Sequence, residues 1–133
     1  MMNTKRSNKA DNGTINNLII SDNLYFDGDK RKASELINKF TGNVLTKKYY
    51  LVCFLNDENK PVIFGSNMLR NKHYQDKRIE LAGIFKSEDD AFEYIRCIAS
   101  LSYRKYKELK FKETINTFDP SDVANLFYNE ENL

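Results

Sequence analysis

Tryptophan is absent from this 133-residue chain, which has only one histidine, two prolines, two cysteines and five glycines. Glycines scattered singly cannot form a glycine-rich phosphate loop, so the familiar nucleotide-dependent enzymes are not expected. Cys53 and Cys97 lie inside apolar segments and belong to no CxxC pair or Cys/His cluster. We therefore expect buried free thiols, no metal site and no cofactor.

The chain also lacks a run of about 18 to 20 apolar residues, the length that a membrane-spanning helix needs. Its N-terminus is polar where a signal peptide would be apolar. These absences predict a cytoplasmic protein without membrane association. The net charge is only +2, from 21 basic and 19 acidic residues. Any attraction to a polyanion must therefore come from local patches.

Apolar residues make up 41% of the chain and aromatic residues 13%, which is enough for one core of ordinary size. We expect a flexible N-terminal tail at residues 1–13 and a single α+β domain at residues 14–133. The expected architecture is a small antiparallel sheet of three to four strands, packed by a long helix and two shorter helices.

Periodicity and turn residues place most elements ahead of the long helix. The first strand is expected within residues 14–21, before a polar turn at residues 27–29, and a helix follows from residue 29 or 30 to Phe40. The segment 66–77 is expected to be a long loop or a short helix. The other expected strands are residues 48–55 and 61–65, which form an antiparallel hairpin, and residues 78–85.

The strand at residues 48–55 is apolar or aromatic on both of its faces. One face must meet a helix, and the other needs a second cover. Cover from within the chain is the favoured interpretation, because three helices can enclose a small sheet. A homodimer or another partner on the second sheet face stays open.

In the strand at residues 78–85, simple alternation divides the side chains between two faces. One face is expected to carry Ile79, Leu81, Gly83 and Phe85, and the other Glu80, Ala82 and Ile84.

A long helix is predicted from Ser87 to about Leu109. Ser87 supplies the N-cap oxygen, and the acidic residues that follow oppose the positive end of the helix dipole. We expect one apolar stripe on this helix to face the core. Its residues are Phe92, Ile95, Ala99, Tyr103 and Tyr106, widened by Ala91, Ile98 and Leu109.

The segment 110–118 alternates in part and is expected to be an edge strand or a covering loop. Asp119 as a cap and Pro120 at the first helical position indicate a short terminal helix after it.

No catalytic constellation emerges from the remaining polar residues. His73 has no acid, nucleophile or metal ligand at a diagnostic spacing. Asp22, Asp27 and Asp29 depart from the calcium-loop pattern. The sequence Glu-Asn-Lys at residues 58–60 matches an acidic-x-Lys element of nucleases but falls on a predicted hairpin turn. We assign no catalytic and no metal-binding residue.

Basic residues gather in two segments, 70–78 and 104–112, each beside tyrosines. Such clusters suit phosphate contacts and base stacking, although lysines near a helix C-terminus also complement the helix dipole. The candidate residues for binding nucleic acid or a partner are Arg70, Lys72, His73, Tyr74, Lys77, Arg78, Arg104, Lys105, Lys107 and Lys110.

The leading hypothesis is a small non-enzymatic protein that binds nucleic acid or a nucleic-acid-handling protein. One alternative is a protein-interaction module, such as a phage or mobile-element inhibitor or accessory subunit that binds a host protein. It predicts an exposed apolar patch. A second alternative is a small enzyme or nuclease-like subunit, which requires His73 or the three aspartates to converge in one cleft.

Overall fold

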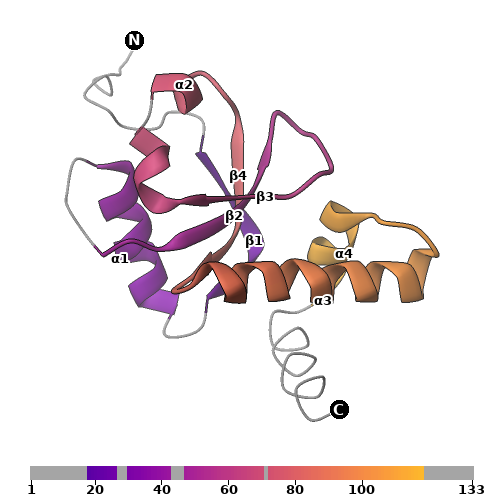
Figure 1. The fold of residues 1–133 in the computed structure, drawn as a ribbon. Helices are drawn as coiled ribbons and strands as arrows, with labels where there is room; N and C mark the ends of the chain where they lie inside the picture. The colour runs from indigo at the N-terminus through magenta and orange to yellow at the C-terminus, as the bar shows by residue number, and fades with distance from the viewer. Residues whose placement is uncertain (1–17, 27–29, 43–46, 71, 119–133) are drawn as a thin grey trace.

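A computed structural model describes residues 18–26, 30–42, 47–70 and 72–118 of the chain. Two helical layers enclose a central sheet (Figure 1). The elements are, in chain order, β1 (Leu18–Phe26), α1 (Lys30–Thr41), β2 (Tyr50–Leu55), β3 (Val62–Gly65), the 3-10 helix η1 (Ser66–Arg70), α2 (Lys72–Gln75), β4 (Ile79–Phe85), α3 (Glu88–Tyr106) and α4 (Phe111–Thr117).

The sheet has four strands in the order β1-β4-β2-β3. Strands β2, β3 and β4 pair antiparallel, whereas β1 runs parallel to β4. The predicted α+β class with a small sheet and one long helix is confirmed. The sheet is mixed rather than fully antiparallel, because β4 inserts between β1 and β2 and thereby runs alongside β1 in the same direction.

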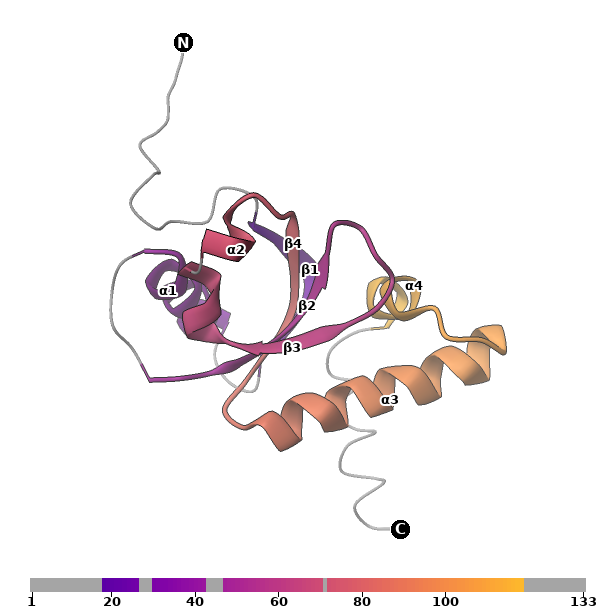
Figure 2. The same ribbon diagram turned by 45° about the horizontal axis from the view of Figure 1, so that its top comes forward.

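Helices cover both faces of the sheet (Figure 2). On one face, Leu36 and Phe40 of α1 pack with Leu51 of β2. On the other face, Phe54 of β2 packs with Tyr94 of α3. Both faces of β2 are therefore buried within the described part of the chain, as the favoured interpretation predicted. A homodimer through the second sheet face stays a prediction.

A bulge in β4 changes which side chains face which layer. Val52 pairs with Gly83 while the next residue of β2 pairs with Leu81, so β4 has one extra residue at this point. Beyond the bulge, Ile84 joins the α1 side of the sheet and Phe85 joins the α3 side. The predicted alternation is correct up to Ala82 and wrong after it.

β1 continues to Phe26, beyond the predicted end of this strand at Ser21. Its first three residues pair in register with β4, and pairing resumes only at Tyr25 after an irregular stretch. Within that stretch, Asn23 donates from Nδ2 to the carbonyl oxygens of Ile115 at 2.8 Å and Phe118 at 3.2 Å. The irregularity thus joins β1 to the end of α4. Residues 14–17 lie outside the described part.

Three predicted elements ahead of β4 are confirmed with small changes of boundary. They are the helix α1, the β2–β3 hairpin and, within the segment 66–77, the short-helix alternative. The hairpin turns at Asn56 and Asp57, which have φ values of 52° and 65°, and Glu58 donates to the Leu55 carbonyl. Asparagine and aspartate tolerate this left-handed backbone better than most residues.

The long helix begins as predicted. Ser87 accepts a hydrogen bond from the Asp90 backbone N–H at 3.1 Å, and the helix ends at Tyr106, before the predicted Leu109. The predicted core stripe is correct for Ala91 and Ile98, which are buried, and wrong for Phe92 and Tyr103, which are 59% and 57% exposed. Apolar residues occupy more than one side of α3, and contact with the sheet selects another face. The buried residues are Ala91, Tyr94, Cys97, Ile98 and Ser102.

Residues 111–117 form α4 and not the predicted edge strand or covering loop. Phe111, Ile115 and Phe118 are spaced for one helical face, and Ile115 is buried against α3 and the sheet. The N-cap residue, Lys110, makes no side-chain cap bond. Instead, Asn59 of the hairpin accepts a hydrogen bond from the Lys112 backbone N–H at 2.9 Å. The predicted terminal helix lies outside the described residues.

Candidate functional site

The two predicted basic clusters lie apart. The first surrounds α2, whose Tyr74 packs on the α1 side of the sheet, and the second lies on α3 and α4 on the other side. Both ribbon views place α2 far from the C-terminal end of α3 (Figures 1 and 2). Within the described residues, the two segments approach each other only at Arg78 and Lys112, which both contact Asp57, so α2 and the end of α3 do not form one continuous binding surface.

Packing and ion pairing occupy much of the first cluster. Tyr74 is half-buried, and its ring stacks on Phe64 at 5.3 Å between centroids. His73 is exposed and meets Tyr74 edge-on at 4.9 Å. Lys77 is half-buried. The side chains of Arg70 and Lys72 lie outside the described part.

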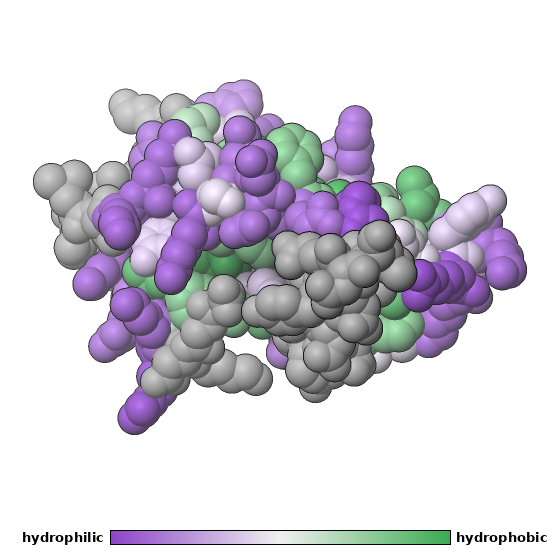
Figure 3. Space-filling view, turned by 60° about the horizontal axis from the view of Figure 1, so that its bottom comes forward, coloured by the Kyte–Doolittle hydropathy of each residue, from purple (hydrophilic) through white to green (hydrophobic). Residues whose placement is uncertain are grey.

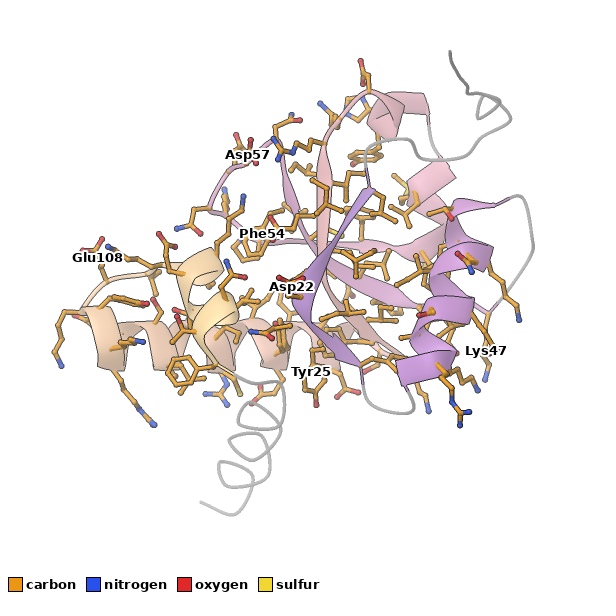
Figure 4. The ribbon with its side chains drawn as sticks, turned by 180° about the vertical axis from the view of Figure 1, so that it is seen from behind. Asp22, Tyr25, Lys47, Phe54, Asp57 and Glu108 are labelled. Atoms are coloured by element: carbon orange, nitrogen blue, oxygen red, sulfur yellow. The ribbon has the colours of Figure 1, made fainter. Side chains whose placement is uncertain are left out.

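Arg78 is neutralised by the hairpin turn. Its Nη1 lies 2.9 Å from Asp57 Oδ2, and its backbone N–H donates to Asn56. Asp57 lies at the outer end of this turn (Figure 4). Lys112 adds a second cation to the same network, with Nζ at 3.5 Å from Glu80 and 3.9 Å from Asp57. This surface carries both signs of charge.

The second cluster differs because four of its cations have no acidic partner among the described residues. Arg104, Lys105, Lys107 and Lys110 form no ion pair with any residue that the structure describes. The first three are exposed and Lys110 is half-buried. We call these four residues, together with Tyr106, the basic end.

Aromatic rings contact the ammonium groups of two of these lysines. The ammonium groups of Lys105 and Lys110 lie 5.5 Å and 5.4 Å from the centroid of the Tyr106 ring. Lys105 also lies 5.6 Å from the Phe118 ring. Cation–π attraction of this kind holds a lysine without cancelling its charge. Two charges are therefore presented together beside one half-buried tyrosine.

Ser102 supports the turn that carries the basic end. Its side chain is fully buried, and its hydroxyl donates to the Glu108 carbonyl at 2.7 Å and accepts from the Lys110 backbone N–H at 2.6 Å. Lys107 occupies the left-handed C-cap position with φ of 62°. A cation here also opposes the negative end of the helix dipole. Glu108 marks this turn at the far end of α3 (Figure 4).

The turn is anchored to the sheet through α4. Asn59 caps the start of this helix, and Asn23 binds its end through two carbonyl groups. Sequence reasoning missed Ser102, Asn23 and Asn59. The only local signal was a serine on an apolar face of the long helix. The two asparagines form hydrogen bonds with residues more than fifty positions away in the sequence, so no local pattern predicts these contacts.

A search of family models, curated proteins and solved structures found no match to this chain. The candidate site therefore depends on its own geometry.

The polar residues considered for catalysis do not gather in the described part. Asp22 lies on β1 and His73 on α2, while Asp27 and Asp29 fall outside the described residues. Among the residues with described positions, no three His, Cys, Asp or Glu side chains are arranged to hold a metal ion. Cys53 and Cys97 are both buried and form no disulfide, and burial raises the pKa of the Cys53 thiol far above its usual value.

The helices of the described segments are either too short or too polar to cross a membrane.

Proposed function

We propose that this protein is a non-enzymatic nucleic-acid-binding protein that contacts phosphate groups through the basic end. The observation that carries the proposal is the contrast in charge pairing. Arg78 and Lys112 are neutralised by Asp57 and Glu80, whereas no described acidic residue neutralises the basic end. Unpaired cations are the groups that exchange condensed counterions on a nucleic-acid backbone.

The arrangement suits contact with phosphates better than recognition of bases. Four cations lie within the last turn of α3 and the connection to α4, and two of them are ordered over Tyr106. Phosphate contacts position a protein without reading sequence. We therefore expect modest, sequence-tolerant binding, with dissociation constants of about 10⁻⁴ to 10⁻⁶ M at physiological salt.

The cellular compartment in which the protein acts is also part of this proposal. Cys53 and Cys97 form no disulfide, and reducing compartments keep thiols in this state. We propose that the protein acts in the cytoplasm, where nucleic acid is also accessible.

Charge reversal at two positions tests the proposal. The double variant Lys105→Glu/Lys110→Glu is expected to bind a fluorescent single-stranded oligonucleotide about 10- to 100-fold more weakly, since two phosphate contacts become repulsive. Fluorescence anisotropy at low ionic strength measures the affinity. Neither substitution removes a buried apolar side chain or an ion pair of the described residues.

The matched control is Lys32→Glu/Lys39→Glu on α1, which changes the net charge equally on the opposite side of the sheet. Both of these lysines are exposed. We expect the control to weaken binding less than threefold, a long-range effect that salt screens. An equal loss in both variants, or an acidic protein bound in place of the oligonucleotide, would contradict the basic end as a nucleic-acid surface.

A further inference from the structure

The outer face of α3 carries an apolar stripe that the core does not use. Phe92, Ala99 and Tyr103 lie on one side of an α-helix, because seven residues separate the first two and four separate the last two. Arg96, which is ion-paired with Glu93, lies on the same side between Phe92 and Ala99. Tyr94 and Cys97, which face the sheet, lie about half a turn away. The two aromatic rings of the stripe are more than half exposed, at 59% and 57%. Hydrophobic side chains are visible on the surface of the part of the molecule that contains α3 and α4 (Figure 3).

The charges of α3 are sorted along its length. Its first turn contains Glu88, Asp89 and Asp90, and its last turn contains Arg104 and Lys105, followed by Lys107 at the C-cap. The stripe therefore runs from an acidic end to a basic end. A helix of this kind is complementary to a second copy of itself in the opposite direction, because each acidic end then meets a basic end.

We propose that this stripe binds the same stripe of a second copy of the chain, with the two α3 helices antiparallel about a two-fold axis. The register follows from the residue spacing. Along α3, the midpoint between Phe92 and Tyr103 lies between Cys97 and Ile98. The midpoint between Glu88 and Lys107 is the same. Hence the register that sets Phe92 opposite Tyr103 of the second copy also sets Glu88 opposite its Lys107.

This arrangement buries each exposed ring of the stripe against another ring. A two-fold axis makes every contact occur twice, which gives two aromatic pairs and two charge pairs for each dimer. Ala99 lies near the axis, and its small side chain lets the helices approach to the usual 8 to 10 Å. A parallel pair would instead bring like charges together at both ends.

The proposal goes beyond the nucleic-acid function and shares only Lys107 with the basic end. Lys105 and Lys110 of the basic end lie over the rings of Phe118 and Tyr106, respectively, and stay outside the pairing. In the dimer, the Lys105 residues of the two copies lie about 22 Å apart along the helix axis, given a rise of about 1.5 Å per residue.

Sedimentation equilibrium of the full chain tests the dimer. We expect the wild-type protein to dimerise, and Phe92→Asp to weaken self-association at least about 100-fold, because the change removes two central ring contacts and adds two charges. Leu109→Asp is the matched control, since Leu109 is 57% exposed but lies off the stripe. It should leave the dimerisation constant unchanged.

A charge exchange tests the antiparallel register. Glu88→Lys and Lys107→Glu are each expected to weaken self-association, and an equimolar mixture of the two variants should form a heterodimer. A wild-type protein that stays monomeric at about 0.5 mM, or a mixture that forms no heterodimer, would overturn the proposal. Oligonucleotide binding by monomeric Phe92→Asp should persist, so failure of the dimer and failure of the nucleic-acid proposal are distinguishable.

Discussion

Replacing Leu51 with alanine is expected to lower the free energy of unfolding by about 2 to 5 kcal/mol. Leu51 is fully buried at the centre of the sheet, where it pairs with Phe64 of β3 and Ile84 of β4 and packs on the α1 side. Removal of its branched end leaves a cavity that the flanking strands cannot close. Urea unfolding monitored by circular dichroism measures the loss.

The matched control is Leu109→Ala, because Leu109 is 57% exposed on the turn after α3. The same chemical change there should alter the free energy of unfolding by no more than about 0.5 kcal/mol. Equal losses at the two positions would mean that β2 is not enclosed by helices on both faces.

Replacing Ser102 with alanine is expected to cost about 2 kcal/mol of stability and to weaken oligonucleotide binding. The buried hydroxyl bonds both the Glu108 carbonyl and the Lys110 backbone N–H, so its removal leaves two backbone groups without a partner. The turn that presents Lys107 and Lys110 then loses its support. Urea unfolding and fluorescence anisotropy measure the two effects.

Ser100→Ala is the control for this change. Ser100 lies on the same helix, half-buried, with no side-chain hydrogen bond among the described residues. Its replacement should leave both stability and binding close to those of the wild type. If Ser102→Ala lost stability yet bound the oligonucleotide normally, Ser102 would support the fold but not the site.

Those parts of the fold that depend on neighbouring residues could be predicted from the sequence. The start of α3 follows from Ser87 and the acidic residues after it, and the β2–β3 hairpin follows from two apolar runs around turn residues. Each signal acts within a few residues. The apolar pattern of residues 48–55 likewise predicted a strand with both faces buried.

The errors arise where contacts distant in sequence decide the outcome. The cap of α4 comes from Asn59 in the hairpin, so residues 110–118 contain no cap of their own to indicate a helix. The bulge in β4 moves Phe85 to the α3 side, and simple alternation cannot show it. On α3, two apolar stripes compete, and only contact with the sheet decides that Phe92 stays outside.

The same limit applies to the candidate site. Composition alone indicated two clusters of basic residues near tyrosines. It could not show that Asp57 pairs with Arg78 from across the hairpin, or that Tyr106 lies close to both Lys105 and Lys110. Charge pairing distinguishes Arg78 from the basic end, and it depends on three-dimensional contacts.

The salt dependence of oligonucleotide binding tests the central claim most directly. If the four cations of the basic end contact phosphates of a single strand, the logarithm of the association constant should fall with the logarithm of salt concentration with a slope of about −3. Lys105→Gln/Lys110→Gln should reduce that slope to about −1.5, since two contacts are lost. An unchanged slope in this variant, or no binding of the wild type at low ionic strength, would contradict the claim.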